Sequence, residues 1–207
     1  MLKEIIIYGA SGHGKVIAEL IQAAYQDINI FFADDREVKI FFELHVGNPK
    51  EVLNKDSQII IGIGNNRIRK RISNELFNSN FVTLVHPRAY VSNSAKLNSG
   101  TVVMAGACIN TNALIGAHVI INTNSSIDHD CIIDDYAHIS PNVGLAGNVK
   151  IGEGSHIGIG ANIIQGIRVG KWAIVGAGAV VIADVPDYAV VVGVPAKIVK
   201  FSVENDS

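Results

Sequence analysis

Residues Val91 to Leu114 read VSNSAK LNSGTV VMAGAC INTNAL, four blocks of six residues, each led by an aliphatic side chain. The pattern continues without a slip, because every sixth residue from Val91 to Val181 is Ile, Leu or Val, sixteen times out of sixteen. The fifth residue of each block is small or β-branched throughout. A period of six matches neither an α-helix nor simple strand alternation over such a length. It predicts a short strand, a turn, and a repeat of both.

Three blocks of six make one triangular coil of 18 residues, which is the signature of a hexapeptide β-helix. The leading aliphatic side chain points inward and stacks on its counterpart in the next coil, and the small fifth residue fills the corner beside it. From Val91 to Pro186 the pattern gives a little over five coils. Each coil contacts only its neighbours, so both ends of the array need caps.

Composition limits the class of protein and its partners. The chain has 207 residues, of which 48% are hydrophobic and 17% charged, as expected for a globular protein. The net charge of −2 and the absence of a basic stripe disfavour nucleic acid as a partner. No apolar run approaches the ~20 residues of a membrane span, so no membrane partner is expected. The two cysteines match no disulfide or zinc spacing, which favours reduced thiols in a cytoplasmic protein.

The region before the repeats follows a different pattern. A first strand opens the chain in place of a signal peptide, and strands alternate with helical segments as far as His86. The expected strands are Glu4–Tyr8, Ile28–Ala33 and Gln58–Ile63, and the expected helices are Lys15–Tyr25 and Arg67–Phe77. This alternation predicts a small parallel α/β domain, residues 1–85, that holds half of a doubly wound nucleotide fold. Residues 86–207 form the predicted β-helix domain with a C-terminal tail.

Three strand ends of the α/β domain carry candidate ligand groups. The turn GASGHG, residues 9–14, opens a helix and can bring backbone N–H groups to a phosphate, although it lacks the G-x-G-x-x-G spacing of dinucleotide sites. A tight turn without a ligand is the alternative. Asp34 and Asp35 end the second strand, where carboxylates can accept ribose hydroxyls, and Arg36 could balance a phosphate. Gly64 and Asn65 end the third strand at the same edge, so we expect a nucleotide site there.

The β-helix contains one unusual pair of side chains, His129 followed by Asp130. A carboxylate beside an imidazole can fix its tautomer and make it a better base. A metal site formed by His118, His129 and His138 is an alternative, although these residues match no ligand-spacing motif. Cys131 occupies a small inward position, so we interpret it as a core residue and not as a nucleophile.

Several motifs together resemble a known family. They are IYGASGHG, the pair Asp34-Asp35, IGNN, the unbroken hexapeptides, NTNSSIDHDC, AGNVKIG and VGVPAK. The chain resembles the two-domain bacterial sugar acyltransferases over roughly Ile5 to Lys200. It is most similar to the UDP-4-amino-sugar N-acetyltransferases of bacillosamine biosynthesis, with the perosamine N-acetyltransferases and sialic acid O-acetyltransferases as further relatives.

The resemblance implies a left-handed parallel β-helix and a homotrimer with active sites between subunits. It also implies roles for individual positions, with His129 as general base and the N–H of Gly147 near the thioester oxygen. The nucleotide-sugar positions are Ser11, Gly12, His13, Asp34, Asp35 and Gly64, and the acetyl-CoA positions are His138, Ile159 and Ala177. The chain departs from the family twice: Asp130 replaces a glutamate, and Ala177 replaces an expected glycine.

The implied reaction is transfer of an acetyl group from acetyl-CoA, as co-substrate and without a metal, to the 4-amino group of a nucleotide-linked amino-deoxysugar. The amine would attack the thioester directly while His129 takes its proton and Asp130 stabilises the imidazolium. Other functions remain open. They are a sugar O-acetyltransferase of the sialic acid type, a non-catalytic or carbonic-anhydrase-like hexapeptide protein, and a nucleotide-sensing regulator.

Overall fold

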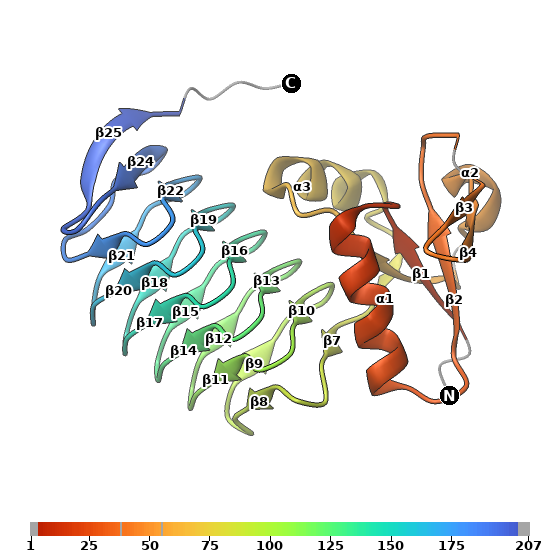
Figure 1. Cartoon of the computed structure of the whole chain (residues 1–207), viewed down its shortest axis with the longest axis horizontal. Helices are drawn as coiled ribbons and strands as arrows, with labels where there is room; N and C mark the ends of the chain where they lie inside the picture. The colour runs from red at the N-terminus through yellow and green to blue at the C-terminus, as the bar shows by residue number, and fades with distance from the viewer. Residues whose placement is uncertain (1–3, 38, 55, 203–207) are drawn as a thin grey trace.

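The computed structural model describes residues 4–37, 39–54 and 56–202 (Figure 1). An N-terminal α/β region is followed by a parallel β-helix whose coils rise in steps toward the C-terminus (Figure 1). The predicted fold class, a half-Rossmann α/β domain followed by a left-handed parallel β-helix, is confirmed.

The α/β region is a six-stranded sheet with the order β3-β4-β2-β1-β5-β6. All its pairings are parallel except β3 with β4. Its elements are β1 (Glu4–Tyr8), α1 (Gly12–Ala24), β2 (Asn29–Ala33), β3 (Ile40–Phe41), β4 (Leu44–Gly47), α2 (Pro49–Val52), β5 (Gln58–Ile61), α3 (Asn66–Glu75) and β6 (Asn80–Phe81). The sequence predicted β1, β2, β5 and the two longer helices, and it gave no sign of β3, β4 or α2.

The β-helix consists of two-residue strands arranged on three faces. The first face contains β7 (Leu84–Val85), β10 (Val102–Val103), β13 (Ile120–Ile121), β16 (His138–Ile139), β19 (His156–Ile157), β22 (Ile174–Val175), β24 (Ala189–Val192) and β25 (Lys197–Phe201). The second face contains β8 (Tyr90–Val91), β11 (Cys108–Ile109), β14 (Ser126–Ile127), β17 (Gly144–Leu145), β20 (Asn162–Ile163) and β23 (Val180–Val181). The third face contains β9 (Lys96–Leu97), β12 (Leu114–Ile115), β15 (Ile132–Ile133), β18 (Lys150–Ile151) and β21 (Arg168–Val169).

The repeat places its side chains as the period predicts. Ile109, Ile127 and Leu145 pair in register at steps of 18 residues, and each is at most 2% exposed. Cys131 is fully buried among them, as expected for a core residue. The coiling extends beyond the sixteen regular blocks at both ends. β7 pairs with β10 before Val91, and β24 pairs with β22 after a corner that is two residues shorter.

Each corner of the coil turns through one residue with positive φ. On the corner between the second and third faces these residues are Asn112, Asp130, Asn148 and Gly166, with φ of 58°, 59°, 60° and 74°. Glycine enters this left-handed region freely, and Asn and Asp do so at a smaller cost than other residues. The conformation of Asp130 is therefore part of the coil geometry itself.

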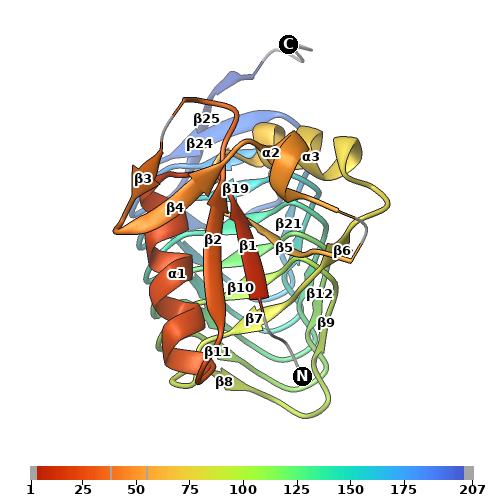
Figure 2. The same cartoon turned by 90° about the vertical axis from the view of Figure 1, so that its right-hand side faces the viewer.

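The α/β region is fixed to the first face of the β-helix. Leu84, Val102 and Met104 are buried in one apolar cluster with α1, which lies along the first coils (Figure 2). α3 covers later coils, where Asn66 donates to the carbonyls of Gly154 and Ser155. Within the three described ranges, no helix is long and apolar enough to cross a bilayer.

Candidate active site

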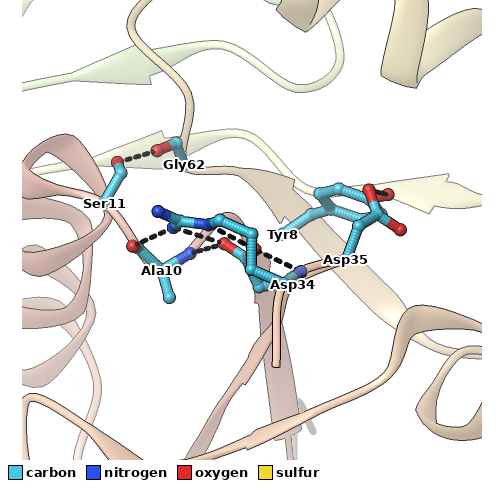
Figure 3. A network of polar contacts seen from close by, with 7 residues as sticks. Tyr8, Ala10, Ser11, Asp34, Asp35 and Gly62 are labelled. Carbon is cyan, nitrogen blue, oxygen red and sulfur yellow. Dashed lines mark hydrogen bonds and ion pairs between the residues drawn. The ribbon is translucent and has the colours of Figure 1, made fainter. Parts of the chain in front are cut away.

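The first loop of the α/β region is held by its own side chains (Figure 3). Ser11 is the N-cap of α1: its Oγ accepts from the N–H of Gly14 and donates to the carbonyl of Gly62 at 2.6 Å. Gly14 packs so tightly that an added Cβ would lie 2.5 Å from the carbonyl oxygen of Gly9. Gly12 is exposed and has open space around it. The loop thus presents the start of α1 at the carboxyl edge of the sheet, where a phosphate can bind.

The two acidic residues after β2 have different surroundings (Figure 3). Asp34 is buried; its carboxylate accepts from the N–H of Ala10 at 2.8 Å and from the backbone and guanidinium of Arg36 at 2.9 Å. The bonds from Arg36 are the main reason that the pKa of Asp34 falls to about 2. Asp35 is exposed and accepts from the Tyr8 hydroxyl at 2.8 Å. Asp35 therefore has free acceptor capacity, whereas Asp34 fixes the first loop.

The third strand end meets the β-helix. Gly64 precedes Asn65, whose side chain caps α3 by accepting from the N–H of Ile68 at 3.1 Å. A hollow of about 490 Å³ opens between this loop and the first face. Its lining residues are Gly64, Asn65, Asn66, Arg67, His138, Gly154, His156, Trp172, Ile174 and Ser202. The structure thus brings predicted nucleotide-sugar residues and the predicted acetyl-CoA residue His138 to one hollow.

Three imidazoles lie close together at the base of this hollow. His138 stacks on His156 with ring centroids 4.8 Å apart, and His13 lies 6.4 Å from His138. The Nε2 of His138 faces the side-chain amide of Asn122 at 3.2 Å. Burial is the main reason that the pKa falls to about 4 for His13 and about 3 for His138. Both rings are neutral at pH 7.

His129 lies on the corner between the second and third faces, where its side chain is 48% exposed. Its Nδ1 is 2.8 Å from Oδ2 of Asp130, and its backbone N–H donates to Asp128. The hydrogen bond to Asp130 and the charge of Asp128 raise the pKa of His129. Because Asp130 occupies Nδ1, the Nε2 atom is left to act as a base.

Gly147 lies one coil after His129 and directly against its ring. A Cβ at this position would be 2.5 Å from Cε1 and 2.6 Å from Nε2 of His129. Only glycine leaves the imidazole its present place. The backbone of Gly147 is also within reach of any group that binds at Nε2.

The remaining predicted residues lie on a different corner. Ile159 and Ala177 are both exposed and follow β19 and β22, between the first and second faces. His129 and Gly147 follow β14 and β17, between the second and third faces. A triangular coil keeps these two corners apart, so within one chain the two sets of residues do not face each other.

The structure does not support the metal alternative. His118 lies on the corner between the third and first faces, where it stacks on Tyr136 and meets the edge of Phe81. It is thus separated from His129, on another corner, and from His138, on the first face. Within the part of the chain that the structure describes, no three His, Cys, Asp or Glu side chains are grouped to hold a metal ion.

Known proteins share both parts of this architecture. Residues 4–76 match the PglD N-terminal domain, and residues 112–147 match the bacterial transferase hexapeptide repeats. The structure is similar to the acetyltransferase domain of PglB from Neisseria gonorrhoeae FA1090 in complex with acetyl coenzyme A. The identity is 40%, with a TM-score of 0.92 over 96% of this chain and 100% of that one. The chain belongs to the PglD-type family of hexapeptide sugar N-acetyltransferases.

Two further relatives of this PglD-type chain have known acceptors. PerB from Caulobacter crescentus, in complex with CoA and GDP-perosamine, is 35% identical, with a TM-score of 0.86 over 96% of this chain and 98% of that one. UDP-N-acetylbacillosamine N-acetyltransferase from Bacillus subtilis (strain 168) is 44% identical over 114 residues. That match covers 50% of this chain and 52% of the relative, so it spans about half of the curated protein. The family resemblance inferred from the sequence is confirmed.

Sequence reasoning missed one buried residue of this PglD-type site. Arg69 was placed in a helix without a role, yet it is 1% exposed and contacts both the Gly64 loop and the β-helix. Helix spacing could have indicated it. Arg69 shares a face with Ile72 and Ser73, three and four residues later, and that face is the buried one.

Proposed function

We propose that the protein transfers an acetyl group from acetyl-CoA to the 4-amino group of a nucleotide-linked amino-deoxysugar. The observation that carries the proposal is the His129–Asp130 pair, held over Gly147 with Nε2 free. The relatives support the donor and acceptor classes: one binds acetyl coenzyme A, and another binds CoA with GDP-perosamine.

The proposed mechanism is direct attack. The neutral amine attacks the thioester carbon, and Nε2 of His129 takes the proton that the nitrogen loses. Asp130, bonded to Nδ1, stabilises the imidazolium that results. The C–S bond then breaks, and the CoA thiolate leaves with the proton from His129 or from water. The N–H of Gly147 is proposed to donate to the developing oxyanion.

The two separate corners lead us to propose a homotrimer. Face composition supports this arrangement. The first face is covered by the α/β region, and the third carries Lys96, Lys150 and Arg168 pointing outward. The outward strand residues of the second face are uncharged, namely Tyr90, Cys108, Ser126, Gly144, Asn162 and Val180. Packing three second faces around one axis brings the His129 corner of one subunit to the Ile159 corner of the next.

The nucleotide-sugar is proposed to bind at the α/β edge. The start of α1 at Ser11, Gly12 and His13 would hold a phosphate, and Asp35 would accept ribose hydroxyls. Asp34 would act through the loop that it fixes. Arg36 is bound to Asp34 and to the carbonyl of Ala10, so it would line the nucleoside end.

Thiol release from acetyl-CoA tests the proposal. Purified protein is mixed with UDP-, GDP- and dTDP-linked 4-amino-sugars and, separately, with free sialic acid. We expect rapid release with one amino-sugar, and a loss of about 10²–10⁴-fold in kcat for His129→Ala with little change in substrate binding. Release with sialic acid alone would assign an O-acetyltransferase. A His129→Ala variant within a few-fold of wild type would refute the base.

A further inference from the structure

Arg69 is a buried arginine whose whole hydrogen-bonding capacity is used by the protein. It is 1% exposed, and its side chain lies between α3, the loop after β5 and two coils of the β-helix. A guanidinium has five N–H donors. They reach His118 O at 2.8 Å, Ile63 O at 3.1 Å, Gly64 O at 3.2 Å, Asn66 Oδ1 at 3.0 Å and Tyr136 O at 2.7 Å.

None of these acceptors carries a charge. Within the described ranges, Arg69 forms no ion pair with a carboxylate. A buried cation without an anion is costly, even when its hydrogen bonds are made. Its charge also contributes, after burial, to the lowered pKa of His13, His118, His138 and His156.

The hollow beside Arg69 shares this positive character. Its lining contains the N-terminus of α3, Arg67 and two histidines, and no Asp or Glu. A helix N-terminus and a nearby cation both favour an anion. The hollow is therefore suited to a ligand group that would balance the charge of Arg69.

The position of Arg69 also links two parts of the site. On one side it holds the carbonyls of Ile63 and Gly64, and on the other it holds the carbonyl of Tyr136, two residues before His138. We propose that Arg69 is a positioning residue that fixes the Gly64 loop relative to His138, and that the diphosphate of the bound nucleotide-sugar balances its buried charge. The identity of this ligand rests on the function proposed above.

Binding of nucleotides to the full chain tests this proposal without turnover. Calorimetry compares UDP, GDP and dTDP with their nucleosides, on wild type, Arg69→Met and Arg69→Lys. For the nucleotide that binds wild type, we expect Arg69→Met to lose about tenfold or more of the diphosphate affinity, with the nucleoside affinity nearly unchanged. Arg69→Lys keeps the charge and should recover part of the loss.

Lys70→Met is the matched control. Lys70 pairs with Glu153 across the same interface but contacts neither Ile63 nor Gly64. It should change diphosphate affinity by less than about twofold. Equal losses for nucleoside and diphosphate in Arg69→Met, or equal effects of both substitutions, would mean that Arg69 only supports the fold.

Hydrogen exchange on wild type covers the case in which Arg69→Met does not fold. The same nucleoside diphosphate should slow exchange of the amides at 64–66 and at 136–138 together, because Arg69 joins them. Protection confined to 9–14 and 34–36, or no binding of any diphosphate, would overturn the proposal. A protein that binds the diphosphate in this way but acetylates no amino-sugar would refute the proposed function and leave the role of Arg69 standing.

Discussion

His129 owes its basicity to acids on its own corner. Asp130 bonds its Nδ1, and Asp128 adds a second negative charge nearby. Both favour the imidazolium, so the pKa of His129 lies above its ordinary value. A general base must be neutral to accept a proton, and the rate should therefore rise with pH through this raised pKa.

Asp130→Asn should move that rise to lower pH. The amide removes the negative charge that favours the imidazolium, so His129 becomes neutral at lower pH, while kcat at high pH falls by about 10- to 100-fold because the imidazolium loses its partner. The measurement is kcat/KM against pH. Asp27→Asn, on the α/β region, serves as control and should leave the profile unchanged. An unaltered acidic limb in Asp130→Asn would argue against Asp130 as the partner of the base.

Gly147→Ala should impair catalysis more than folding. The new methyl would lie within 2.6 Å of two ring atoms of His129, and the exposed ring can swing outward to relieve the clash. We expect kcat to fall by about tenfold or more, and the thermal midpoint to change by only a few degrees. Steady-state kinetics and a thermal melt on the same sample check this. Full activity would show that the ring position seen here is not the working one.

The corners of the coil are the elements that decide its local stability. Their fourth residues all have positive φ, and the residue types that fill them are mostly Gly, Asn or Asp. Asn142, on the corner between the first and second faces, has φ of 58°. A β-branched residue is strained there, whereas glycine is not.

Asn142→Val should therefore destabilise the coil by about 1–2 kcal/mol. Asn142→Gly at the same position should stay within about 0.5 kcal/mol, because glycine adopts this conformation freely. Thermal unfolding of the two variants side by side measures the difference. Equal midpoints would show that the corner conformation is not fixed by its φ angle.

The sequence predicted most of the elements because their patterns are local. The leading residues from Val91 to Val181 defined the β-helix, and apolar spacing defined α1 and α3. The extra coil strand β7 was missed because a two-residue strand in an irregular segment carries no period of its own. The strands β3 and β4 were missed because their exposed residues follow no alternation.

The site was only partly predictable for a related reason. The pair His129–Asp130 is adjacent in sequence, so a motif reveals it. The closeness of His13, His138 and His156 depends on how α1 and α3 dock on the first face, which no local pattern encodes. The closing of Arg36 onto Asp34 likewise follows from the conformation of one turn.

At the scale of the whole molecule, the proposed assembly makes the active site depend on the second face. Ser126→Arg places a long cation at an exposed position in the middle of that face. It should convert a trimer into monomers of 22.1 kDa and abolish turnover, because the two corners no longer meet. Light scattering after size exclusion measures the mass. Leu114→Arg, exposed on the third face, is the control and should leave the trimer intact. A monomeric wild type with full activity would refute the trimer.

The step of 18 residues between paired strands gives the molecule a built-in unit of length. The α/β region is fixed to certain coils through α1 and α3, while the corner residues advance along the axis by one strand spacing, about 4.8 Å, for each coil. Inserting or deleting one complete coil would preserve every inward side chain and every corner. It would move the donor cleft relative to the nucleotide pocket by that one increment. The reach between the two substrates is thus quantised, and a lineage on this scaffold could fit acceptors of different size by changing the number of coils.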